Sequence, residues 1–104
     1  MTSAIAKRYA RALAGVAGEQ NRLEETATEL EKLAAWLDDA DVKAAFDSPN
    51  LGVTARRGLV TRLAEALGLS ELARNFLSLL ADRNRLDQFR PIVLAYQALV
   101  DRSL

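Results

Sequence analysis

LARNFLSLLADRNRL, residues 72–86, is the stretch on which our interpretation of the whole chain rests. At 100° per residue its apolar side chains gather on one side of a helix, with Leu77 at their flank, and the opposite side is polar. This is the helical period, so the stretch predicts a core helix. The apolar side consists of Leu72, Phe76, Leu79 and Leu80.

The edge of this predicted helix is the first candidate binding site. Asn75 and Leu79 lie one turn apart, where the apolar side meets the polar side. A partner could be held there by apolar packing and an amide hydrogen bond together. We therefore expect Leu79 to be only partly buried, while Leu72, Phe76 and Leu80 hold the core.

The composition argues against catalysis. The 104 residues are enough for one domain with a single core, and fourteen basic residues balance fourteen acidic ones, which makes nucleic-acid binding unlikely to be the function. The absence of Cys and His removes thiolate and imidazole chemistry and the usual zinc, copper and haem ligands. No phosphate-binding loop or nucleophile elbow occurs. We expect no enzyme activity, cofactor or metal.

The sequence also contains no membrane-spanning or secretory signal. No apolar run approaches the roughly 20 residues that would cross a bilayer, and MTSAIAKRYARALAG, residues 1–15, lacks the apolar core of a signal peptide. Its basic, acid-free start shares features with mitochondrial transit peptides, but the pattern continues into an amphipathic helix. We therefore interpret it as mature structure and expect no direct membrane insertion.

Strand signals are almost absent, so the chain is predicted to be an all-α bundle of six helices. Capping residues and helix-ending residues divide the chain. The first two predicted helices cover about 3–18 and 21–37, and a short helical turn capped by Asp41 follows in DVKAAF (41–46). The fourth covers 55–67 after a Thr54 cap, the fifth runs from Ser70 to Asn84, and the last is capped by Asp87.

The first predicted helix has an unusually wide apolar arc. Its apolar residues span roughly 200° on a helical wheel, whereas about 100° is enough to sit on one core. Either the helix is buried on two sides, or one side receives another helix. Ala6, Ala10 and Ala12 are small enough to let a guest backbone approach closely. A groove between the first and fifth helices is therefore one hypothesis.

Trp36 projects away from the apolar seam of the second helix on a wheel. It is either a rim residue beneath a neighbouring helix or a contact residue, and the rim interpretation is favoured.

Three blocks of the sequence carry a resemblance to a known family. AKRYARAL (6–13), FDSPNL (46–51) and NFLSLLADRNRL (75–86) followed by the Pro91-Ile92 pair occur in the family's order and separation. Together they resemble the N-terminal domain of the delta subunit of F-type ATP synthases, called oligomycin-sensitivity-conferring protein in mitochondria. The resemblance covers essentially the whole chain. Asn84 departs from a frequent Gly, and Arg83 from a smaller polar residue.

The resemblance implies a six-helix bundle in which helices one and five form a groove for the N-terminal helix of an alpha subunit. It also implies a non-catalytic stator, part of the peripheral stalk of the proton-translocating enzyme, that keeps the catalytic head from turning with the rotor. Tyr9, Ala12, Asn75 and Leu79 match the family's groove residues, and Arg85 matches a family position that could equally be a bend residue. Periodicity alone adds Ala6, Val16 and Phe76.

The same resemblance sets expectations for the protein's surroundings. The family's second half, which binds the peripheral stalk, is absent, so residues 1–104 are expected to form one helical domain of a longer subunit. A monomer at the cytoplasmic face of a bacterial inner membrane is expected, in preference to a mitochondrial or chloroplast counterpart. The alternative is a free-standing helical module that binds another amphipathic helix or self-associates through the groove.

Overall fold

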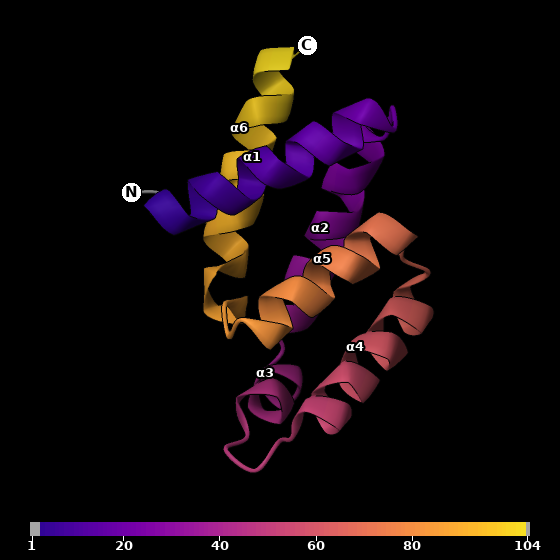
Figure 1. The fold of residues 1–104 in the computed structure, drawn as a ribbon, viewed down its shortest axis with the longest axis vertical. Helices are drawn as coiled ribbons and strands as arrows, with labels where there is room; N and C mark the ends of the chain where they lie inside the picture. Colours follow the sequence, from indigo (N-terminus) through magenta and orange to yellow (C-terminus); the bar gives the residue numbers. More distant parts are fainter. Residues whose placement is uncertain (1–2, 104) are drawn as a thin grey trace.

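The structure is a computed structural model that describes residues 3–103, and this part of the chain contains helices and no strand (Figure 1). The predicted all-α class with six α-helices is confirmed. The elements are α1 (Ala4–Glu19), α2 (Leu23–Leu37), α3 (Ala40–Asp47), α4 (Val53–Leu67), α5 (Glu71–Asp82), a 3₁₀ turn (Leu86–Gln88) and α6 (Phe89–Ser103).

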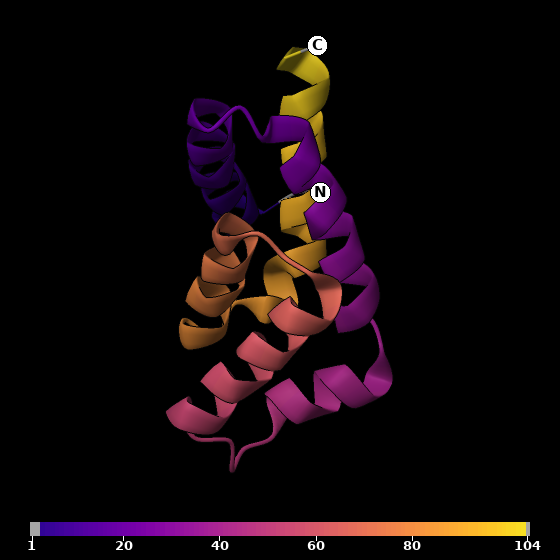
Figure 2. The ribbon, with the colours of Figure 1, turned by 90° about the vertical axis from the view of Figure 1, so that its right-hand side faces the viewer.

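Helix α6 is the centre of the bundle. It packs against α1 and α2, while α4 and α5 pack on each other below α1 (Figure 1). Turned by 90°, α1 and α5 again lie on the same side of the molecule, at the left of the view, with α2 and α6 on the opposite side (Figure 2). The two helices are therefore neighbours on one face.

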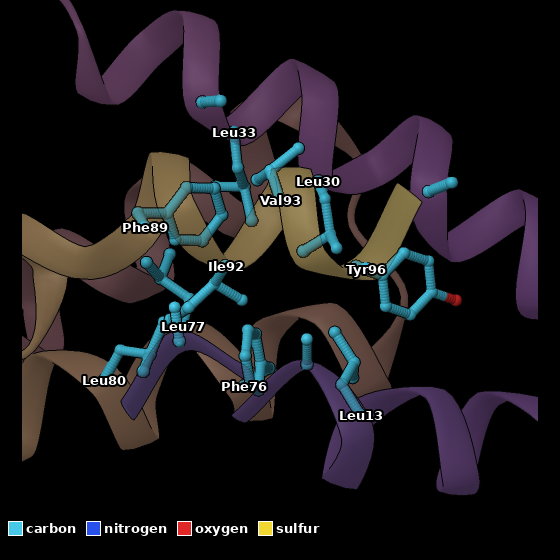
Figure 3. Close-up of a cluster of buried hydrophobic side chains, with 14 of the residues drawn as sticks. Leu13, Leu30, Leu33, Phe76, Leu77, Leu80, Phe89, Ile92, Val93 and Tyr96 are labelled. Atoms are coloured by element: carbon cyan, nitrogen blue, oxygen red, sulfur yellow. The ribbon is translucent and has the colours of Figure 1, made fainter. Parts of the chain in front are cut away.

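The core is formed where α2, α5 and α6 meet (Figure 3). Its side chains recur at helical spacing, as the apolar stripes of the sequence require. Among the largest that are completely buried are Leu30, Leu33, Leu77, Leu80, Ile92, Val93 and Tyr96.

Tyr96 is the polar member of this core. Its hydroxyl donates a 2.6 Å hydrogen bond to the backbone carbonyl of Leu23, which ties α6 to the start of α2. Burial raises the pKa of the Tyr96 phenol above its ordinary value, and the neighbouring Thr26 hydroxyl partly offsets this rise. The ring therefore fills the core while its oxygen stays hydrogen-bonded.

Several predicted helix ends are confirmed. Ser3 caps α1 by accepting a 3.0 Å hydrogen bond from the Ala6 amide, and Ser70 caps α5. Gly68 and Asn84 both adopt left-handed backbone conformations, with φ of 62° and 55°, at the ends of α4 and α5. At these four positions the residue type favours the observed backbone conformation or cap.

Other helix boundaries differ from the prediction. Helix α1 continues past Gly18 to Glu19, and Asn21, expected to begin the second helix, instead takes a left-handed φ of 57° in the connection. Asp39, not Asp41, caps α3, because its carboxylate accepts from the amides of Asp41 and Val42 at 2.8 and 3.2 Å.

The starts of the fourth and sixth helices also differ. Helix α4 begins at Val53 with Gly52 as its N-cap, so Thr54 lies inside the helix. Asp87 lies in the 3₁₀ turn, and α6 begins at Phe89, which places Pro91 in the first turn, where its missing N–H is tolerated.

Candidate binding surface between α1 and α5

The N-terminus of α5 is fixed to α2 by the carboxylate of Glu29, whose side chain is largely buried. The Ser70 amide and hydroxyl donate to the two carboxylate oxygens of Glu29 at 2.5 and 2.8 Å, and the Ser70 hydroxyl oxygen accepts from the Ala73 amide at 3.2 Å. Arg22 lies 3.7 Å from the same carboxylate. The first turn of α5 is therefore positioned by side chains far away in the sequence.

The C-terminus of α5 is closed by its own backbone. After Asn84 turns left-handed, the Arg85 amide donates a 2.8 Å hydrogen bond to the Leu80 carbonyl. Arg85 is exposed in this bend. This placement is the one expected for a residue of the bend.

The wide apolar arc of α1 is divided between the core and the surface. Its central stripe, Ala6, Ala10, Leu13 and Ala17, is buried. The stripe that precedes it by one residue is left partly or fully open, and it comprises Ile5, Tyr9, Ala12 and Val16. Residues at these spacings share one side of a helix, so the open stripe is continuous.

Tyr9 and Phe76 join α1 to α5. Their rings meet edge to face, with centroids 6.4 Å apart and planes inclined at 70°. This is a favoured aromatic geometry. The Tyr9 hydroxyl accepts a 3.3 Å hydrogen bond from Arg83 at the end of α5. Two contacts thus hold the helices beside each other on the face that Figure 1 views from the front and Figure 2 from the side.

Apolar surface remains open on both sides of this junction. Leu79 is 37% exposed and Val16 is 41% exposed, although both are large hydrophobic residues. The expectation that Leu79 is only partly buried is confirmed. Ala12 and Asn75 are also exposed. We call Tyr9, Ala12, Val16, Asn75 and Leu79 the α1/α5 surface.

Two of the predicted site residues lie beneath this surface. Phe76 is 6% exposed and supports the ring of Tyr9 from within. Ala6 is 0% exposed, because it belongs to the buried stripe of α1. Ala6 consequently has no surface to offer a partner in this structure, and Phe76 lies behind the ring of Tyr9.

In the sequence, Arg83 stands out only as a departure from the family pattern. Its spacing could have indicated a place beside the candidate site, because Arg83 stands four residues after Leu79 and therefore on the same side of the helix. Trp36, in turn, is 45% exposed on α2. Trp36 is not part of the α1/α5 surface, whose residues all come from α1 and α5.

Chemically, the α1/α5 surface is a place for packing. It combines aliphatic and aromatic area with one amide and one phenol, and the guanidinium of Arg83 lies beside the phenol. Among residues 3–103 there is no group of three side chains suited to hold a metal ion. No helix in this same part of the chain is both long and apolar enough to cross a bilayer.

The fold and this surface together define a small all-α bundle with exposed apolar side chains on two neighbouring helices. Comparison with known families assigns such a chain more narrowly. The family model described as "ATP synthase delta (OSCP) subunit" matches residues 5–104. The chain therefore belongs to this family of ATP synthase subunits, which is structural and non-catalytic.

Individual relatives give the same result. The chain is 36% identical over 101 residues to ATP synthase subunit delta of Geobacter sp. (strain M21), covering 96% of this chain and 56% of that protein. It is 37% identical over 105 residues to that of Anaeromyxobacter dehalogenans (strain 2CP-C), covering 100% and 59%. It is 36% identical over 104 residues to ATP synthase subunit delta 1 of Syntrophotalea carbinolica, covering 99% of this chain and 58% of that protein. The chain thus spans a little over half the length of these bacterial relatives.

Proposed function

We propose that this chain is a stator element of a proton-translocating ATP synthase and that its α1/α5 surface binds the N-terminal helix of one alpha subunit. The observation that carries the proposal is the pair of exposed hydrophobic side chains, Val16 and Leu79, on adjacent helices joined by Tyr9 and Phe76. A guest helix would bury both side chains, and Asn75 would hydrogen-bond its polar edge.

This surface suits a mechanical task. A stator must resist torque, which requires slow dissociation of the bound helix. Buried apolar contacts with a few oriented hydrogen bonds supply this better than exposed ion pairs, which contribute little and are screened by salt. Ala12 supports the proposal further, because its single methyl group lets a helix backbone come close to α1.

The rest of the proposal concerns the surroundings of the subunit. We place the contact with the peripheral stalk in a part of the subunit other than residues 1–104, and the complex at the cytoplasmic face of a bacterial inner membrane. The bacterial relatives support this location. The chain is proposed to be monomeric in isolation.

The test is a titration of ¹⁵N-labelled protein with a synthetic peptide of the alpha-subunit N-terminal helix, followed by amide shifts. Shifts confined to α1 and α5, with an affinity that changes little as salt is raised, are expected. A steep loss of affinity with salt would contradict an apolar surface. Absence of peptide-induced shifts, together with concentration-dependent dimers, would favour self-association instead.

A further inference from the structure

The most exposed large hydrophobic residue of the described chain lies away from the α1/α5 surface. Leu94 on α6 is 61% exposed, although it sits near the middle of the central helix. An exposed leucine alone needs no explanation. Leu94, however, borders a hollow of about 280 Å³ between α6 and α1, together with Ala95, Ala98 and Leu99.

The hollow continues along α1. A second hollow of about 410 Å³ shares Arg11, Leu99 and Arg102 with the first, and it extends to Gly15 and Gly18. Apart from the immediate helix surroundings, no described atom of residues 3–103 lies within 4 Å of the position that a Cβ would take at either glycine, so neither position is covered by this part of the chain. We call this surface the α1/α6 shelf.

The shelf is long and is formed by two helices. From Lys7 to Gly18 it follows α1 for about 16 Å, at 1.5 Å per residue, which is about three turns of a guest helix. Both ribbon views show α6 continuing beyond its crossing with α1 toward the C-terminus (Figures 1 and 2). A helix laid along α1 would therefore rest on the exposed side of α6.

Three cations surround the apolar floor of the shelf. Lys7 and Arg11 come from α1 and Arg102 from α6. In the part of the chain that the structure describes, none of the three forms an ion pair. Among residues 3–103 no carboxylate lines either hollow, so the described lining combines apolar area with positive charge.

We propose that the α1/α6 shelf is a second docking surface, which binds an amphipathic helix whose apolar stripe is flanked by Glu or Asp. Leu94, Ala98 and Leu99 would receive the apolar stripe, and the cations would pair with the flanking carboxylates. This inference does not rest on the proposed function, because the two surfaces share no residue. The two surfaces also differ in the expected salt dependence of binding, because affinity for the shelf should fall with salt whereas affinity for the α1/α5 surface should change little.

The test uses a designed peptide of about 18 residues, long enough to cover the shelf. Leu and Ala form one face and Glu flanks it, and a control peptide has Lys in place of every Glu. Each peptide is titrated into the ¹⁵N-labelled protein. The Glu peptide is expected to shift amides around Lys7, Arg11 and Leu94, and the Lys peptide is expected to bind at least tenfold more weakly.

Variants separate the shelf from the α1/α5 surface. R11E/R102E is expected to reverse the preference, so that the Lys peptide now binds better, which a merely structural role of these arginines would not produce. L94E is expected to weaken the Glu peptide at least tenfold. L79E, on the other surface, should leave Glu-peptide binding to the shelf unchanged. All four positions are exposed, and circular dichroism checks that each variant is folded.

Salt and vesicles complete the test. Raising salt from about 0.05 to about 0.5 M should weaken Glu-peptide binding severalfold, because exposed ion pairs are screened. The proposal is overturned if both peptides bind equally, if shifts fall only on α5, or if R11E/R102E leaves the preference intact. It is also overturned if vesicles of phosphatidylcholine and phosphatidylglycerol shift the shelf amides while the Glu peptide does not.

Discussion

Replacing alanine by aspartate at Ala12 and at Ala10 separates binding from folding on a single helix. The two residues are two positions apart on α1, yet Ala10 is completely buried and Ala12 is exposed. The chemical change is identical in both variants. The A10D variant therefore serves as the matched control for A12D.

The expected magnitudes differ widely. A12D changes helix propensity by about 0.7 kcal/mol, which lowers the melting temperature by roughly 3–6 °C in a protein of this size. A10D places a carboxylate in the core without a partner and costs at least about 3 kcal/mol, so the melting temperature should fall by at least about 12 °C or the fold should be lost.

A12D, which hardly affects folding, should strongly weaken binding of the alpha-subunit peptide. In A12D the carboxylate would lose water beneath the apolar side of the guest helix, at a cost of about 2–3 kcal/mol. The affinity for the alpha-subunit peptide should then fall about 30- to 150-fold. Calorimetric titration measures the affinity, and thermal unfolding followed by circular dichroism measures the stability.

Two results would refute the reasoning. If A12D unfolds the protein as severely as A10D, the open stripe of α1 is part of the core and the surface has been misplaced. If A12D is folded and binds the peptide with unchanged affinity, the guest helix does not pass over Ala12.

Three further predictions concern single residues. L79A should weaken peptide binding about fivefold with a small effect on unfolding, whereas L80A, one residue further and fully buried, should lower the free energy of unfolding by about 2–5 kcal/mol in denaturant titrations. Tyr96 should make stability fall in alkali: with the pKa of its phenol raised by burial above the ordinary 10.0, its contribution is fully present below pH 10 and declines as pH rises from there through the raised folded value. Comparing urea unfolding of the parent and Y96F below and above pH 10 checks this, and an equal alkaline loss in Y96F would contradict it. D39A should remove the cap of α3 and cost about 1 kcal/mol in the same assay, and an unchanged urea midpoint would show that the cap is not needed.

Local sequence chemistry accounts for much of the fold. The helical period predicted all six helices, and Ser3, Ser70, Gly68 and Asn84 end or begin helices as expected. The misplaced boundaries occur where two neighbouring residues could fulfil one role. At α3, for example, two consecutive acidic residues precede the helix and another follows its first residue, and only the backbone path selects Asp39 as the cap.

The candidate surface shows the limit of sequence reasoning more clearly. Asn75 and Leu79 could be recognised at the boundary of an apolar stripe, because angular position on a helix follows from spacing alone. The contact of Arg83 with Tyr9 could not, because it depends on two helices that are 74 positions apart along the chain at this contact.

For this protein, the sequence by itself determined the helical class, the helix ends at Ser3, Gly68, Ser70 and Asn84, and the angular position of every apolar side chain. The tertiary structure decided which part of the wide apolar arc of α1 is covered. Ala6 and Ala12 are the same residue type in the same arc, yet the packing of α1 against its neighbours buries the first and leaves the second open. Spacing fixes the direction in which a side chain points, but only the position of the neighbouring helices fixes what it meets.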